Sequence, residues 1–136
     1  MTARGGTGVE TVLDASAIVA LLFGEPGAVE VAEVIATGLA VISTVNLSEV
    51  AAVFVRKDKA LRPVLPALAS QVTLESFGPA DGYTAAEMFP LTRAVGLSFG
   101  DRACLALAAR RGACALTADS AWLGLDLPVD VRMIRC

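Results

Sequence analysis

The sequence predicts one α/β domain in which helices cover a parallel sheet. Three observations support this fold class. The chain has 136 residues, the usual size of a single domain, 55% of them are hydrophobic, and short β-prone runs alternate with helical patterns. Aromatic residues make up only 5% of the chain, so aliphatic residues supply most of the apolar content. Such a composition suits helices packed closely on a buried sheet and argues against disorder.

The N-terminal third alternates strands and helices that are bounded by turn residues. A β-prone segment over 11–13 leads into an apolar helix over 17–23, which stops at the turn 24–27. A second helix over 28–36 precedes a short apolar strand over 40–43. This alternation predicts parallel strands that are joined by helical crossovers.

The next segment, 46–57, is predicted to be an amphipathic helix. Its apolar residues recur at i, i+3, i+4 and i+7: Leu47, Val50, Ala51 and Phe54. Glu49 lies on a different stripe of the same helix, among mostly apolar neighbours.

The C-terminal half continues the alternation. Its expected elements are a short helix near 63–70, a strand over 72–77, a helix over 80–95, a helix over 98–111, and strands over 113–116 and 131–134. Pro90 is expected to kink the helix over 80–95, because proline has no N–H and its ring clashes with the preceding turn. The helix over 98–111 has both ends marked, by a capping-box pattern from Ser98 to Asp101 and by Gly112.

Composition excludes several kinds of site and location. The chain has no histidine, which excludes Ser-His-Asp and Cys-His hydrolases and zinc sites made of cysteine and histidine. Cys104, Cys114 and Cys136 lack metal-ligand spacing, and this favours a reducing, cytoplasmic location. No apolar run approaches the roughly 18 residues of a membrane span. Residues 1–10 are expected to be a flexible leader without a secretory signal, followed by one domain over 11–136.

The chain is slightly acidic, with 11 Lys and Arg against 14 Asp and Glu and a net charge of −3. It therefore offers no overall basic surface for a polyanion. Basic residues are nevertheless grouped locally, at Arg56, Lys57, Lys59 and Arg62, and later at Arg102, Arg110 and Arg111. Such groups can steer phosphate, and Arg56 and Lys57 are the candidate substrate-binding residues. A solvated helix end is the alternative interpretation of the first group.

Four acids stand against apolar sequence at the ends of strands or near the starts of helices. Asp14 and Asp119 each follow a predicted strand, whereas Glu49 and Asp101 fit the third position of a capping box. Taken singly, Asp14 and Asp119 are explained as well by an Asx turn or an N-cap as by a metal site, and a capping box explains Glu49 and Asp101 slightly better than a metal site does. Together they all point to the carboxyl edge of the sheet, where ligands of α/β proteins bind.

Converging carboxylates repel one another, and a hard divalent cation is the usual reason for a fold to collect them. Mg²⁺ or Mn²⁺ suits a site of oxygen ligands and would activate a water for hydrolysis of a phosphodiester. Ser16 and Thr117, each two residues from an acid, are candidate hydroxyl groups that support the acids.

The four acids lie within recognisable segments that follow one another in order. The segments read Val-Leu-Asp-Ala-Ser-Ala at 12–17 with Gly-Glu-Pro-Gly at 24–27, Asn-Leu-Ser-Glu-Val at 46–50, Leu-Ser-Phe-Gly-Asp-Arg-Ala-Cys-Leu-Ala-Leu-Ala at 97–108, and Leu-Thr-Ala-Asp-Ser-Ala-Trp at 116–122. In this order they resemble the acid-bearing motifs of PIN-domain ribonucleases, most closely those of VapC toxins from type II toxin-antitoxin systems.

This resemblance implies a three-layer α/β/α sandwich with a central, mainly parallel sheet over residues 11–136. It implies a Mg²⁺- or Mn²⁺-dependent endoribonuclease, an RNA substrate, a cognate antitoxin that blocks the acidic pocket, and a homodimer. By position, Asp14 and Asp101 would be the chief metal ligands, and Asp119 would complete the metal site directly or through water. Glu49 would orient or deprotonate the attacking water.

Three other functions are weighed against this one. A receiver domain needs an adjacent pair of acids after the first strand and a lysine at a later strand end, which 13–15 and 116–118 lack. A haloacid-dehalogenase-type phosphatase needs a second aspartate where Ser16 stands. The remaining alternative is a catalytically inactive PIN-like module that binds a protein partner, with the four acids acting only as helix caps.

Overall fold

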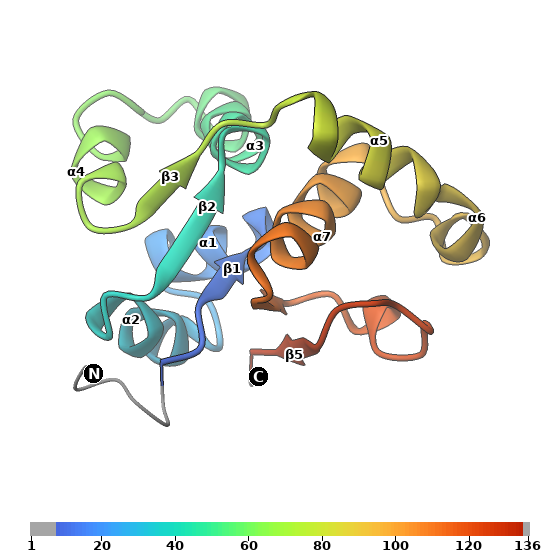
Figure 1. Cartoon of the computed structure of the whole chain (residues 1–136). Helices are drawn as coiled ribbons and strands as arrows, with labels where there is room; N and C mark the ends of the chain where they lie inside the picture. Colours follow the sequence, from blue (N-terminus) through green and yellow to red (C-terminus); the bar gives the residue numbers. More distant parts are fainter. Residues whose placement is uncertain (1–7, 135–136) are drawn as a thin grey trace.

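Five parallel strands form the centre of the molecule, in the order β3-β2-β1-β4-β5 (Figure 1). The strands of this computed structural model, which describes residues 8–134, are β1 (Thr11–Leu13), β2 (Ala40–Ser43), β3 (Thr73–Glu75), β4 (Cys114–Thr117) and β5 (Val131–Met133). The chain adds strands on one side of β1 first and on the other side later. The winding therefore reverses between β1 and β4, which is where open α/β sheets bind their ligands.

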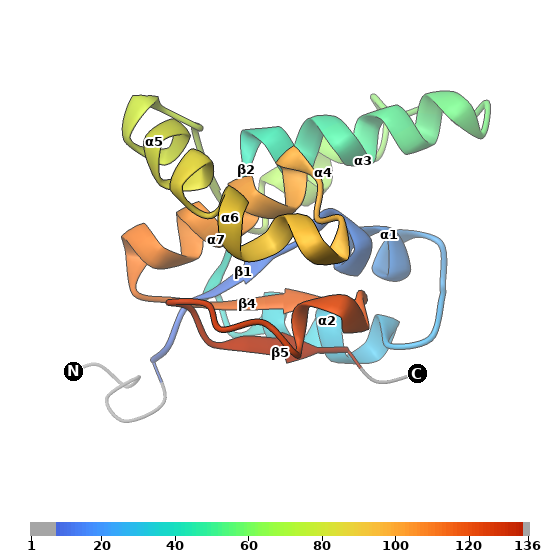
Figure 2. The same ribbon diagram turned by 90° about the vertical axis from the view of Figure 1, so that its right-hand side faces the viewer.

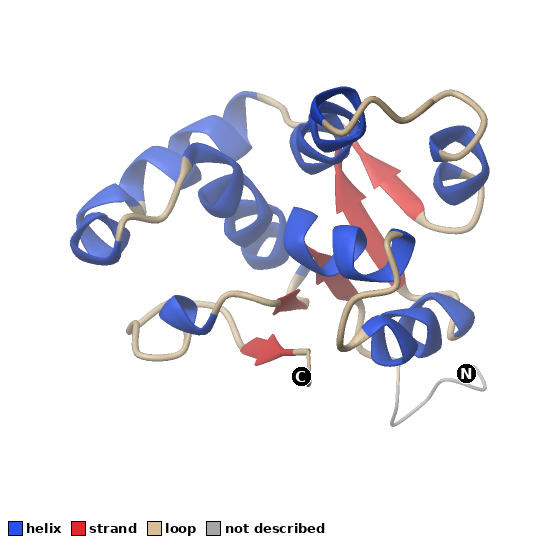
Figure 3. Cartoon of the chain, turned by 180° about the vertical axis from the view of Figure 1, so that it is seen from behind, coloured by secondary structure: helices blue, strands red, loops and turns tan. Residues whose placement is uncertain are grey.

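Helices cover both faces of the sheet and confirm the predicted α/β fold (Figures 2 and 3). They are α1 (Ala15–Leu22), α2 (Ala28–Ala36), α3 (Thr44–Arg56), α4 (Leu65–Ala69), α5 (Pro79–Glu87), α6 (Phe89–Thr92) and α7 (Phe99–Arg111), with 3₁₀ turns η1 (Arg93–Val95) and η2 (Ser120–Trp122). Helices α1 to α4 pack on one face, and α7 lies on the other with α5 against it.

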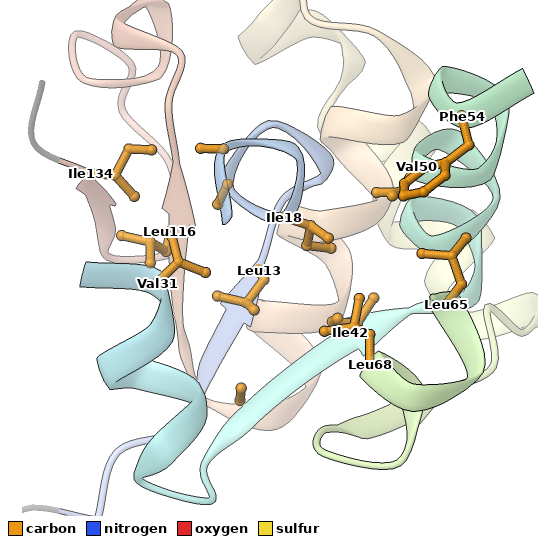
Figure 4. Close-up of a cluster of buried hydrophobic side chains, with 13 residues drawn as sticks. Leu13, Ile18, Val31, Ile42, Val50, Phe54, Leu65, Leu68, Leu116 and Ile134 are labelled. Carbon is orange, nitrogen blue, oxygen red and sulfur yellow. The ribbon is translucent and has the colours of Figure 1, made fainter. Parts of the chain in front are cut away.

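Successive strand residues point to opposite faces of the sheet and supply two separate cores. Leu13, Ile42 and Leu116 face α1 to α4, where Figure 4 shows them among side chains from those helices. Their neighbours Val12, Val41 and Ala115 pack instead beneath α7. The strands are buried on both sides, which is why they read as short continuous apolar runs rather than as alternating ones.

Helix α3 begins earlier than the sequence predicts. Ser43 is its N-cap, and its hydroxyl oxygen accepts a hydrogen bond from the backbone N–H of Val45 at 3.1 Å. Asn46 and Glu49 therefore lie inside the helix, so the interpretation of Glu49 as a capping-box residue is wrong.

The helical stretch after β3 is broken where a kink is predicted. Helix α5 ends at Glu87 and α6 begins at Phe89, directly before Pro90. Proline cannot donate the backbone hydrogen bond that would continue α5. The remaining helices and strands lie within a few residues of their predicted bounds, and Gly112 ends α7 in the left-handed conformation at φ 61°.

Further predictions from the sequence concern the leader over 1–10, Cys136 and membrane-spanning helices. Of the expected leader, residues 1–7 lie outside the described part of the chain, as does Cys136. Glu10 is held by Arg111, whose Nε and Nη2 donate to its two carboxylate oxygens at 2.9 and 2.8 Å. Over residues 8–134, no helix combines the length and the apolar character needed to cross a membrane.

Candidate active site

Asp14 lies directly after β1, at the boundary where the winding of the sheet reverses. Its backbone N–H donates to the carbonyl of Leu116, and its side chain is 3% exposed. Ser16 and Thr117 donate their hydroxyl protons to Oδ2 of Asp14 at 2.6 and 2.9 Å. Asp14 occupies the N-cap position of α1 but makes no side-chain cap. A capping role therefore does not explain this buried carboxylate.

The same two hydroxyl groups connect Asp14 to the segment after β4. Ser16 Oγ accepts from the backbone N–H of Ala118 at 2.9 Å, and Thr117 Oγ1 accepts from that of Asp119 at 3.0 Å. Each hydroxyl donates once and accepts once, which a serine or threonine can do simultaneously. The position of the Asp119 backbone is thus linked to that of the Asp14 carboxylate.

Asp101 and Asp119 both cap local structure. Oδ2 of Asp101 accepts from the backbone N–H of Ser98 at 2.8 Å, and Ser98 Oγ accepts from that of Asp101 at 3.2 Å, which completes the capping box of α7. Asp119 is exposed, and its Oδ1 accepts from the backbone N–H of Ala121 at 3.0 Å. The capping interpretation is therefore correct for Asp101 and Asp119. It does not explain why these two acids lie close to Asp14 and Glu49.

Glu49 comes to the same place from α3. Asn46, one turn earlier in the helix, donates one amide hydrogen to Oε1 of Glu49 at 2.8 Å and another to the carbonyl of Gly100 at 3.0 Å. Gly100 is the residue before Asp101 in the first turn of α7. Asn46 thus holds Glu49 and joins α3 to the helix that carries Asp101.

The four acids, Asp14, Glu49, Asp101 and Asp119, form a carboxylate cluster that is unfavourable in electrostatic terms. Burial raises the pKa of Asp14 to about 6, against an ordinary value of 3.8, and the nearby charge of Asp101 adds to the rise while Ser16 opposes it. Burial also raises the pKa of Glu49, with a smaller contribution from Asp101. The pKa of Asp101 is raised by burial and, to a smaller extent, by Asp119. Asp101 therefore couples electrostatically to the other three acids.

The donor set suits a hard cation rather than a soft one. Cys104 lies beneath the carboxylate cluster, where burial and the charges of Asp14, Asp101 and Glu49 raise the pKa of its thiol well above the ordinary value. A thiolate ligand is thus disfavoured. No group of three or more acids or cysteines within residues 8–134 is arranged to enclose a metal ion. Mg²⁺ characteristically binds through one or two carboxylates and keeps several waters, so these residues fit such an ion.

The predicted basic residues lie in different environments. Arg56 lines a groove of about 380 Å³ together with Glu49, Val19 and Val53. Lys57 lies outside this groove, with its Nζ 5.5 Å from the ring centroid of Phe23.

The later arginines are already engaged. Arg102 donates to the carbonyl of Leu97 at 2.9 Å and lies over the ring of Phe89. Arg110 and Arg111 form salt bridges with acids, so their charges are largely balanced within the fold.

Two residues of this site were not singled out from the sequence. Asn46 precedes Glu49 by one helical turn, and Gly100 occupies a helical position where glycine is disfavoured. Gly100 could have been found from the sequence, because a glycine within a predicted helix lowers helix stability and so suggests that a side chain is excluded there.

Comparison with known proteins places this geometry in a family. The PIN domain model matches residues 11–126. Among solved structures, the chain is similar to VapC20 of Mycobacterium tuberculosis, a toxin that cleaves the sarcin-ricin loop (TM-score 0.69, 18% identity, 85% of this chain and 94% of that one). It is also similar to DNA-bound VapBC of Salmonella typhimurium (TM-score 0.68, 16% identity, 92% and 98%).

A third similar structure is a toxin-antitoxin complex from Klebsiella pneumoniae (TM-score 0.66, 13% identity, 82% of this chain and 88% of that one). At these identities the likeness shows a shared fold alone. A comparison with curated protein sequences gives no match. The match of the family model over most of the chain, on a sheet that gathers four acids at its carboxyl edge, shows that this protein belongs to the PIN-domain family.

Proposed function

We propose that this protein is a Mg²⁺- or Mn²⁺-dependent endoribonuclease that acts as the toxin of a type II toxin-antitoxin system. The observation that carries the proposal is the convergence of Asp14, Glu49, Asp101 and Asp119, where burial and, to a smaller extent, the repulsion between acids raise the pKa of three of them. Capping roles alone would not bring four acids from separate elements together. An oxygen-only site of this kind fits a cation that neutralises phosphate charge.

Asp14 and Asp101 are the proposed metal ligands, and Asp119 completes the site directly or through water. When bound, the cation supplies charge neutralisation at the scissile phosphate and activates a water. Ser16 and Thr117 hold the Asp14 carboxylate in one orientation through their hydrogen bonds to Oδ2. The capping box fixes Asp101 in the first turn of α7 in the same way.

Glu49 is the proposed base that orients or deprotonates the attacking water. Its pKa is raised by burial, and a carboxylate with a raised pKa is a better base near neutral pH. The hydrogen bond from Asn46 to Oε1 favours the ionised form that a base requires. Burial and the hydrogen bond from Asn46 thus act on the pKa of Glu49 in opposite directions, and burial is the larger effect.

The groove beside Glu49 is the proposed path of the RNA. Its lining includes apolar side chains and the acids Glu25 and Glu49, and Arg56 is the cationic residue among them. We propose that Arg56, with Lys57 next to it in sequence, contacts backbone phosphates. Such contacts strengthen binding without selecting a sequence.

A protein antitoxin is the proposed regulatory partner. Two of the similar structures are VapBC or toxin-antitoxin complexes, which supports a partner of this kind here. The apolar part of the groove lining is suited to a protein segment that covers the carboxylates. A homodimer is also proposed, because α5, α6, η1 and the start of α7 leave large apolar side chains exposed, at Tyr83, Phe89, Leu91, Val95 and Phe99. We infer a cytoplasmic location from the free thiols of Cys104 and Cys114.

Cleavage of total cellular RNA by the purified protein tests the proposed function. We expect discrete fragments with Mg²⁺ or Mn²⁺, and none with EDTA or with the Asp101→Asn variant. Fragments that persist in EDTA would contradict the proposed metal dependence. Absence of cleavage under every condition would instead favour the catalytically inactive binding module.

A further inference from the structure

We propose that Gly100 is a positioning residue, because the space left by its missing side chain seats the carboxylate of Glu49. Gly100 is buried in the first turn of α7. A Cβ built on it would overlap both carboxylate oxygens and the Cδ of Glu49. The carboxylate therefore lies where any other residue at position 100 would place its first side-chain carbon. This inference rests on the proposed function, since it assigns Gly100 a role through the proposed base.

Backbone geometry does not explain the glycine. Five described glycines, Gly24, Gly27, Gly38, Gly96 and Gly112, have positive φ angles, and Gly100 is not one of them. Its helical conformation is open to alanine, which favours a helix more than glycine does. What excludes a methyl group at this position is the Glu49 side chain.

Asn46 holds the carboxylate of Glu49 by a hydrogen bond. It is fully buried, and its amide nitrogen donates both to Oε1 of Glu49 and to the carbonyl of Gly100. Its Oδ1 is buried without a hydrogen-bond partner among the described residues. The opposite amide orientation would place Oδ1 against two acceptors, so Glu49 and Gly100 together determine how the amide points. The position of the Glu49 carboxylate thus depends on two residues. Asn46 donates a hydrogen bond to it, and Gly100 leaves the space that it occupies.

A methyl group at position 100 should displace Glu49 and leave the helices in place. The overlapping atoms are the far end of a flexible side chain rather than backbone, so the carboxylate can swing away at little expense in stability. A small misplacement of a group that acts on the substrate can lower a rate by about 100-fold. We therefore expect Gly100→Ala to separate activity from stability.

Gly82→Ala is the matched control. Gly82 lies within α5, and a Cβ there would meet only the ring of Phe77, at 3.7 Å, which is ordinary contact. Both variants exchange a helical glycine for alanine. We expect Gly100→Ala to lower kcat of metal-dependent RNA cleavage by about 10- to 100-fold with KM within about twofold, while Gly82→Ala changes neither.

The combination with Glu49→Ala tests whether Gly100 acts through Glu49. Once the carboxylate is removed, adding Gly100→Ala should cause no further loss of kcat, because nothing remains to be displaced. A further loss of the same size in the double variant would overturn the proposal. So would a Gly100→Ala protein that unfolds, since the glycine would then serve packing.

The side-chain amide of Asn46 gives a readout that does not depend on activity. In the wild type we expect slowly exchanging NMR signals for its two amide protons, and in Gly100→Ala shifted signals that exchange faster. Gly82→Ala should leave them unchanged. If the wild type cleaves no RNA but these signals respond, the positioning of Glu49 is supported and the proposed function fails. Unchanged signals with a normal kcat in Gly100→Ala would overturn the inference itself.

Discussion

The two ends of helix α7 place acids in opposite electrostatic surroundings. At its C-terminal end, Arg110 binds Asp81 and Glu75 at 2.8 and 3.0 Å, and Arg111 binds Glu10 at 2.8 Å. We refer to these five residues as the arginine cluster. At its N-terminal end, no salt bridge within the described residues reaches any member of the carboxylate cluster.

The difference separates acids that are paired with arginines from acids that have no salt bridge within the described residues. In the arginine cluster each carboxylate has a cationic partner, so its charge contributes to attachment of α7 to β1, β3 and α5. In the carboxylate cluster, Asp14 is buried and Glu49 and Asp101 are partly buried beside like charges, which opposes folding unless a cation is supplied. Chemistry is therefore expected at the end where the charge is left unbalanced.

The largest expected effect is on the rate of RNA cleavage, and it should differ between an acid of the carboxylate cluster and an acid of the arginine cluster when each is changed to its amide. Asp101→Asn should lower the rate of RNA cleavage by at least about 100-fold, because removing a metal ligand should cost more than disturbing the groups that orient the ligands. Asp81→Asn, an isosteric change at a buried acid of the arginine cluster, should leave the rate per folded molecule unchanged. Rates measured on both purified proteins check this, and equal reductions would remove the distinction between the clusters.

The second prediction concerns pH and stability in metal-free protein. The pKa of Asp14 is about 6 in the fold and near 3.8 when unfolded, so the native state holds this proton more tightly. The contribution is fully present below pH 3.8 and is lost as pH rises through 6, a fall of about 3 kcal/mol in the free energy of unfolding.

Asp14→Asn should remove the Asp14 part of this dependence, leaving the smaller part that the raised pKa values of Glu49 and Asp101 cause, and it should exceed the wild type in stability at pH 7 by up to about 3 kcal/mol. Urea unfolding at pH 4 and pH 7 in EDTA measures it. Added Mg²⁺ should stabilise the wild type and not the variant, because only a protein that binds the ion gains by mass action. A variant less stable than the wild type at pH 7 would show that Asp14 stabilises the fold.

The third prediction is that neutralising an acid of the arginine cluster lowers stability, whereas neutralising Asp14 raises it. Asp81→Asn should lower the free energy of unfolding by about 1–2 kcal/mol, since Asp81 is buried while Arg110 remains 38% exposed and screened. Glu75→Gln, at a more exposed acid, should lower it by less than about 1 kcal/mol. Urea unfolding at pH 7 measures both, and a stabilised Asp81→Asn protein would contradict the assigned role.

The smallest expected effect is on RNA affinity. Arg56→Ala together with Lys57→Ala should weaken binding a few-fold and reduce the dependence of log K on log salt by about 0.7 for each phosphate that is no longer neutralised. Because Arg56 lines the groove with Glu49 and Lys57 does not, Arg56→Ala alone should account for most of the change. Arg110→Ala, at a paired arginine, should leave the slope unaltered. Binding titrations at several salt concentrations check this.

Much of the fold could be predicted from local sequence patterns, because the spacing of buried apolar residues follows the period of the helix or strand that carries them. The buried strands, the capping box at Ser98 and the break near Pro90 all depend on residues close in the chain. The start of α3 differs from the predicted start because either Ser43 or Asn46 can act as an N-cap, and only the end of β2 decides between them.

Long-range contacts could not be predicted in this way. The pairing of Arg110 with Asp81 and the fit of Glu49 over Gly100 depend on how helices cross, which local propensities do not encode. The four acids were identified one by one as residues against apolar sequence. Their coupling through Asp101 emerges only when α7 is placed over the boundary between β1 and β4.

Pairing of β1 with β4 also sets the order in which the protein matures during synthesis. The hydroxyl of Thr117 and the carboxylate of Asp14 meet across 103 positions of sequence, and contacts of such separation form late. A nascent chain that ends before α7 carries Asp14 and Glu49 but neither Asp101 nor Asp119. The carboxylate cluster is therefore complete only after the last part of the domain has left the ribosome, and chains that terminate before α7 carry only two of its four acids.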